Sequence, residues 1–164
     1  MTTDVFIGID PGKNGAIAAI NGKGQPLDAR LFKAADTDGR IALIVADFIS
    51  EFETFNQFIC IEKVGAMPGQ GVVSMFSFGR AYGEAWAGAL LSKALLSSVT
   101  PAVWQHALAL PKRADNGAAH KRVLRQLAEA RFGRNALIGA ATADAFWLAE
   151  YCRLHGPHSI KAEV

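Results

Sequence analysis

Two short apolar runs, each ended by a carboxylate, place the strongest constraint on how this chain can fold. FIGID ends at Asp10 and FICIE ends at Glu62. Continuous apolar runs of this length are typical of strands that are covered on both faces of a sheet, which requires helices on either side. The two carboxylates then stand at an edge of the sheet, where ligands of α/β folds bind. A third acid, Asp144 in ATADAFWLAEYC, lies on an expected helix that could pack against the same edge.

Asp10, Glu62 and Asp144 together predict a metal site suited to phosphodiester hydrolysis. Mg²⁺ takes oxygen ligands from a few carboxylates and leaves room for substrate phosphate oxygens. Each acid alone has a simpler interpretation: a turn residue before PGKNG, an ion pair with Lys63, or an ordinary polar position on an amphipathic helix. The ion pair is disfavoured because adjacent residues of a strand point to opposite faces.

The remaining pattern predicts a mixed α/β sheet with helices on both faces. Strands are expected at 4–10, 15–20, 27–33, 57–63 and 95–99, and helices at 37–53, 74–92, a short segment from Thr100 and Pro101, 118–130, and a last helix that ends near Leu154. Thr37 or Asp36 is placed to cap the first helix, and Gly156 with Pro157 to end the last. A chain of 164 residues, 51% of them hydrophobic, fits one domain (1–164) with one core.

Basic residues are concentrated in one segment of the chain. Residues 111–134 hold seven Lys and Arg against two acidic residues, a net charge of +5, so the rest of the chain carries about −3 of the total of +2. This asymmetry suggests a surface for phosphates, although a basic segment this short can also be a solvated face.

The sequence gives no sign of a membrane protein. No apolar run reaches the length of a membrane span, and MTTDVFIGID lacks the charged start and the cleavage site of a signal peptide. We therefore expect an intracellular, cytoplasmic protein.

Several motifs resemble those of the RuvC-type Holliday junction resolvases, in particular the short phage and prophage members. The match is carried by GIDPG at 8–12, IEKV at 61–64, PGQGVVSMFSFGRAYG at 68–83, VTPAVW at 99–104 and ADAFWLAEY at 143–151. GIDPG alone would be weak, whereas the GQG segment directly after IEKV is much more specific. The order of elements is similar to the ribonuclease H-like fold, a five-stranded mixed sheet in which the first and fourth strands are neighbours.

The resemblance implies a metal-dependent, structure-selective endonuclease that resolves four-way DNA junctions by paired symmetric nicks. Asp10, Glu62 and Asp144 would be the ligands of two Mg²⁺ or Mn²⁺ ions, and Lys121 would lie near the scissile phosphate. Two nicks related by symmetry require a homodimer. The residues that we expect to contact DNA are Gln70, Phe76, Arg80, Lys112, Arg113, Lys121 and Arg122. His120 could assist the phosphate site, and Trp86, Trp104 and Trp147 are expected in the core or at a dimer contact.

One departure from the family concerns the helix of Asp144. The family has a further acid or a histidine about one helical turn earlier, where this chain has Gly139, Ala140, Ala141 and Thr142. Positions 140 and 141 would share a helix face with Asp144. Because this acid is missing, one alternative is a junction-binding protein without nuclease activity. A second alternative, a fragment of an actin-like ATPase or sugar kinase, follows from the likeness of GIDPGKNG to a phosphate-binding hairpin. Measurable affinity for ATP would favour the latter.

Overall fold

Five strands form one mixed sheet in the order β3-β2-β1-β4-β5. The computed structural model describes residues 3–12, 14–32, 39–63, 65, 69, 71–112 and 117–159, with side chains as far as 156. The strands are β1 (Asp4–Asp10), β2 (Ala16–Asn21), β3 (Pro26–Leu31), β4 (Asn56–Glu62) and β5 (Leu95–Val99). β2 runs antiparallel to β1 and β3, whereas β4 runs parallel to β1 and β5. The expected fold class is confirmed, and each strand lies within two residues of its predicted bounds.

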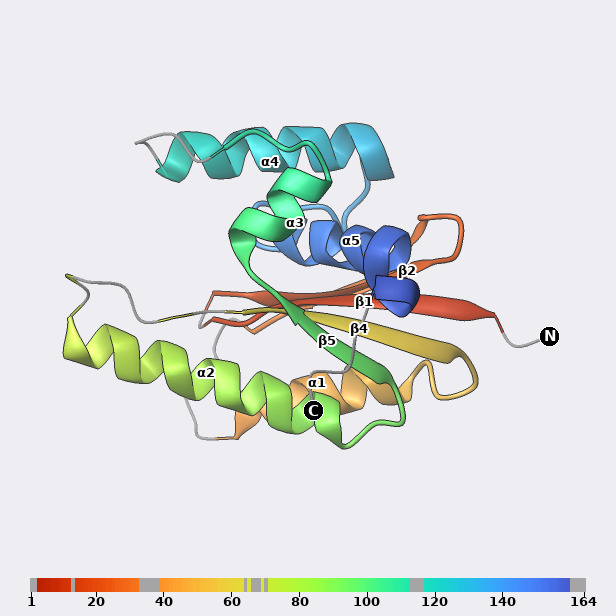
Figure 1. The fold of residues 1–164 in the computed structure, drawn as a ribbon, viewed down its shortest axis with the longest axis horizontal. Helices are drawn as coiled ribbons and strands as arrows, with labels where there is room; N and C mark the ends of the chain where they lie inside the picture. The colour runs from red at the N-terminus through yellow and green to blue at the C-terminus, as the bar shows by residue number, and fades with distance from the viewer. Residues whose placement is uncertain are drawn as a thin grey trace.

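Helices cover both faces of the sheet (Figure 1). α1 (Arg40–Ser50) and α2 (Val72–Leu90) lie on one face, and α3 (Pro101–Ala107), α4 (Gly117–Phe132) and α5 (Ala143–Ser159) lie on the other. Among the described helices, none is both long enough and apolar enough to cross a bilayer.

The two-residue period of β1 divides its side chains between two cores. Val5, Ile7 and Ile9 are buried with residues of α1 and α2. Phe6 instead belongs to the core beneath α5, where its ring stacks on that of Phe58 with centroids 5.2 Å apart. Asp10 has the same parity as Phe6 and therefore stands on the α5 face of the sheet.

Gly8 permits an unusually close approach of α5 to β1. A Cβ atom at this position would lie 2.0 Å from the carbonyl oxygen of Ala145 and 2.4 Å from the backbone nitrogen of Ala149. No side chain fits there unless α5 moves away from the sheet. The glycine therefore sets the distance between the end of β1 and the first turn of α5.

α1 begins later than expected, and a distant residue satisfies its first turn. The helix starts at Arg40 after Gly39, which has a φ of 79° and makes no side-chain cap. The predicted caps, Asp36 and Thr37, lie outside the described residues. The backbone N–H of Ile41 instead donates to Glu84 Oε2 of α2 at 3.0 Å. A tertiary contact thus satisfies one of the free N–H groups at this terminus.

α5 and α3 correct two other local predictions. The last helix runs to Ser159, past Pro157, instead of ending near Leu154. Thr100 precedes α3 with extended backbone and Pro101 opens the helix as expected, but the threonine side chain makes no capping hydrogen bond.

Candidate active site

Asp10 and Glu62 end neighbouring parallel strands and face the same side of the sheet. The register that pairs Ile9 with Ile61 places the two acids at adjacent positions. Glu62 shares its parity with Cys60, which is buried in the core under α5. Both carboxylates are partly buried. The strand pairing thus brings together two acids that are 52 positions apart in the sequence.

Asp144 comes to this edge from the first turn of α5. Thr142 fixes the turn before the helix, because its Oγ1 accepts from the N–H of Gly139 at 2.8 Å and donates to the carbonyl of Leu137 at 2.6 Å. A carboxylate in a first helical turn is favoured by the helix dipole. Residues 139–142 are therefore committed to a turn, and none of them offers a carboxylate.

The three carboxylates interact electrostatically. Burial is the main reason that the pKa of Asp10 rises from 3.8 to about 8, and the charges of Glu62 and Asp144 raise it further while Lys121 lowers it. Burial also raises the pKa of Glu62 to about 6. The pKa of Asp144 is raised by burial too, against the opposing charges of Lys121 and His120. Like charges gathered in a partly buried place favour a bound cation.

Trp104 is a member of the site that the sequence did not indicate. Its side chain is buried, and its Nε1–H donates to Glu62 Oε1 at 2.9 Å. This hydrogen bond lowers the pKa of Glu62, in opposition to burial. Trp104 was expected in the core or at a dimer contact, and the structure places it in the core. Its indole also holds the carboxylate of Glu62 in one orientation.

The three acids line one cleft of about 1140 Å³ between the sheet edge, α3 and the start of α4. Lys121 is exposed on the wall of this cleft, as is Lys112. α4 is tied to α5 by Trp147, whose Nε1–H donates to the carbonyl of Leu124 at 3.1 Å. That bond fixes the first turns of α4, with Lys121, against the helix that carries Asp144.

The other residues predicted to contact DNA are more scattered. Phe76 and Arg122 are exposed, on α2 and α4, but neither lines the cleft, whereas Phe78 does. Arg80 lies 3.7 Å from Glu84, so it forms an ion pair within its own helix. Gln70 and Arg113 lie outside the described residues.

The donor set fits a hard divalent cation in its chemistry, because the converging groups are carboxylate oxygens beside an open cleft. Burial is the main reason that the pKa values of Asp10 and Glu62 are raised, and the neighbouring acids raise them further against the charge of Lys121. In the described part of the chain, no three His, Cys, Asp or Glu side chains stand close enough to form a ready-made metal cage.

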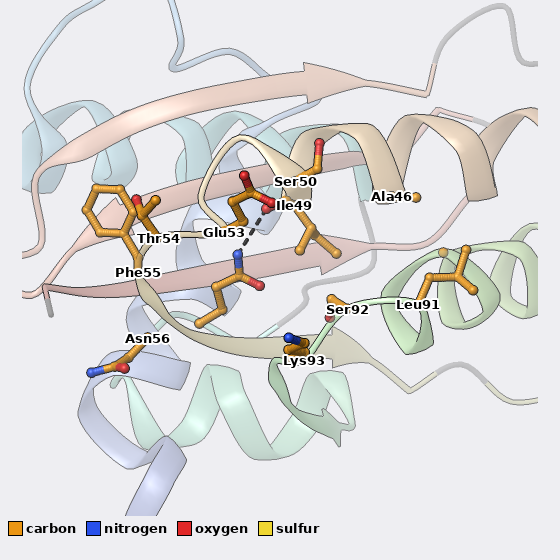
Figure 2. Close-up of a pocket in the computed structure, with 12 residues that line it drawn as sticks. Ala46, Ile49, Ser50, Glu53, Thr54, Phe55, Asn56, Leu91, Ser92 and Lys93 are labelled. Carbon is orange, nitrogen blue, oxygen red and sulfur yellow. Dashed lines mark hydrogen bonds between the residues drawn. The ribbon is translucent and has the colours of Figure 1, made fainter.

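A second hollow, of about 700 Å³, lies at the opposite end of β4 (Figure 2). It is formed by the end of α1, the start of β4 and the turn after α2. The side-chain amide of Gln57 donates to the carbonyl of Ile49 at 3.0 Å across it. Its ionisable groups are Glu53 and Lys93, so it lacks the gathering of acids that marks the first cleft.

Comparison with solved structures places this fold beside the RuvC structures. A Thermus thermophilus RuvC in complex with a Holliday junction substrate superposes with a TM-score of 0.67 at 17% identity, covering 94% of this chain and 96% of that chain. A second T. thermophilus RuvC structure gives a TM-score of 0.61 at 21% identity, with coverage of 92% and 96%. No protein-family model and no curated protein matches the sequence. At this level of identity the likeness shows the shared fold.

Proposed function

We propose that this chain is a divalent-metal-dependent endonuclease that resolves four-way DNA junctions by paired symmetric nicks. The observation that carries the proposal is the meeting of Asp10, Glu62 and Asp144, from three separate elements, in one cleft beside Lys121. The solved structure with a shared fold in complex with a Holliday junction supports the substrate class.

Each residue of the cleft has a distinct part in the proposed reaction. Asp10, Glu62 and Asp144 bind the metal, and Trp104 keeps the Glu62 carboxylate turned toward it. Two Mg²⁺ or Mn²⁺ ions held there would activate a water molecule and stabilise the leaving 3′ oxygen. Lys121 orients the scissile phosphate and offsets the negative charge that develops on it.

The proposed DNA surface extends from the cleft along its basic wall. Lys112 and Lys121 line the cleft, and Arg122 is exposed on the same helix as Lys121. These contacts address the phosphate backbone, so recognition depends on the shape of the junction more than on base edges. Affinity for the junction should therefore fall steeply as salt increases.

A homodimer would supply the two active sites that symmetric nicking requires. The first half of α2 offers a surface for the second copy, because Val72, Val73 and Phe76 are 83%, 80% and 72% exposed. Large apolar side chains exposed close together on one helix are the kind of surface that a partner covers. Sedimentation of the wild type and of Val73→Asp tests this part of the proposal: the wild type should sediment as a dimer and the variant as a monomer.

The function is tested by cleavage of an end-labelled four-way junction beside a linear duplex of the same sequence, in Mg²⁺ and in Mn²⁺. We expect symmetric nicks on the junction alone, which disappear with Asp10→Asn. Equal cleavage of the duplex would contradict structure selectivity, and cleavage in EDTA would contradict the role of the metal.

A second candidate function is junction binding without cleavage, motivated by Ala140 and Ala141, which stand where the resemblance leads us to expect a further acid or histidine. The structure places both in the turn before α5, so they do not share a helix face with Asp144 as the sequence predicted. An inactive chain with tight, salt-sensitive binding would support it. If this candidate is correct, Ala140→Asp and Ala141→Asp should both remain inert, and a gain of cleavage in either variant would exclude it.

A further inference from the structure

His120 is a polar group for which the proposed reaction has so far given no role. It lies in the first turns of α4, beside Lys121, and lines the same cleft as the three carboxylates. Its Nε2 is buried and makes no hydrogen bond within the described part of the chain. Buried polar atoms without partners are rare in folded proteins, and each calls for an explanation such as an ion, a water molecule or a catalytic role.

The surroundings of His120 contain the acids expected of an ion site. His120 lines the same cleft as Asp144, Asp10 and Glu62. A neutral imidazole nitrogen next to carboxylate oxygens is a common metal-binding combination.

We infer that His120 supplies a metal ligand through Nε2, next to Asp144. This inference rests on the proposed function and adds to it the identity of a fourth ligand, which comes from α4 and not from the turn before α5. That turn is closed by the hydrogen bonds of Thr142, and residues 139–142 do not line the cleft. The hydrogen bond from Trp147 to Leu124 fixes α4 against α5, which keeps His120 within reach of Asp144.

A nitrogen ligand also sets the preference of the site among cations. Mg²⁺ strongly prefers an all-oxygen shell, whereas Mn²⁺ accepts imidazole. The site should therefore bind Mn²⁺ more tightly than Mg²⁺. His120→Asp should narrow that preference, because it exchanges the nitrogen for a carboxylate oxygen.

The test is pulsed electron paramagnetic resonance of Mn²⁺ bound to the protein without DNA, together with calorimetric Mn²⁺ affinity. We expect the wild type to show nitrogen-14 modulation. His120→Gln should lose the modulation and bind Mn²⁺ about tenfold more weakly, whereas His120→Asp should lose the modulation but keep an Mn²⁺ affinity near that of the wild type. The matched control is His106→Gln, since His106 lies on α3, lines the same cleft and is exposed. The control should keep both the modulation and the affinity.

The outcomes separate this inference from the proposed function. Mn²⁺ binding that Asp10→Asn abolishes, without nitrogen modulation in the wild type, would overturn the role of His120 and leave the carboxylate site intact. Modulation that persists in His120→Gln and disappears in His106→Gln would also overturn it. Absence of Mn²⁺ binding that depends on Asp10 would overturn the inference and the metal-dependent function together.

Discussion

Replacing Asp10 by Asn should stabilise the metal-free protein, although it removes a residue that the proposed reaction needs. Folding raises the pKa of this carboxyl group from 3.8 to about 8, so between these values the folded state binds a proton that the unfolded state has lost. Stability contributed by this group therefore falls as pH rises from about 4 to about 8. Asn is neutral at every pH and avoids this loss.

The size of the effect follows from the shift in pKa. One unit corresponds to about 1.36 kcal/mol, so Asp10 lowers the free energy of unfolding by up to about 2 kcal/mol at pH 5 and about 4 kcal/mol at pH 7. In EDTA, we expect the free energy of unfolding of Asp10→Asn to exceed that of the wild type by amounts of this order. Saturating Mn²⁺ should narrow this gap at pH 7, because an ion that binds only the folded wild type at one hundred times its Kd adds about 2.7 kcal/mol to the free energy of unfolding.

Urea unfolding followed by tryptophan fluorescence at pH 5, 7 and 8 measures these differences. Asp4→Asn is the matched control, since Asp4 lies at the opposite end of the same strand and accepts a 2.9 Å hydrogen bond from Asn56 that an amide oxygen can also accept. A gap between wild type and Asp10→Asn that does not widen from pH 5 to pH 7 would refute the reasoning. So would an equal gap for Asp4→Asn.

Three further substitutions probe the supports of the site. Trp104→Phe removes the hydrogen bond that lowers the pKa of Glu62, so the acidic limb of the pH–rate profile for junction cleavage should move to higher pH. An unchanged profile would contradict the role of Trp104 in lowering this pKa. Glu150→Gln removes the charge of a residue that is only 3% exposed and whose carboxylate accepts hydrogen bonds from Arg131 and Arg153 at 2.6–3.0 Å, so the free energy of unfolding in urea at pH 7 should fall by about 3 kcal/mol. Folding lowers the pKa of Glu150 from 4.5, so the difference from the wild type should shrink as pH falls below 4.5, and a loss under about 0.5 kcal/mol at pH 7 would contradict the importance of these contacts. Gly8→Ala forces α5 away from β1, so it should lower the free energy of unfolding by about 1–3 kcal/mol and weaken Mn²⁺ binding. Gly22→Ala is its control, because a Cβ there would meet nothing within 4 Å, and equal effects of the two substitutions would refute the close-approach argument.

The sequence was sufficient for the parts of the site that follow from local periodicity. Alternation along β1 and β4 decides which face each side chain takes, so a carboxylate at the end of each strand could be assigned to a sheet edge without coordinates. Asp144 could be placed on a helix from its apolar surroundings. What placed that helix over the sheet edge is the approach at Gly8, and a lone glycine in a strand pattern does not reveal which helix it meets.

The parts that the sequence did not reveal depend on contacts between distant segments. Trp104 and Glu62 are 42 positions apart, and nothing in VTPAVW shows that the indole donates to a carboxylate. In the first turn of α1, the N–H of Ile41 donates to Glu84, which lies 43 positions later in the sequence. The unpartnered nitrogen of His120 likewise becomes visible only when all its neighbours are in place.

The central claim is that three carboxylates act together as one metal site for DNA cleavage. Single-turnover cleavage of a four-way junction by the wild type, Asp10→Asn, Glu62→Gln and Asp144→Asn, each with its junction affinity measured in parallel, tests it most directly. The account predicts that every variant loses at least about 10²-fold in rate, equivalent to about 3 kcal/mol, while binding the junction as tightly as the wild type. A variant that binds the junction and cuts it at the rate of the wild type would contradict the account.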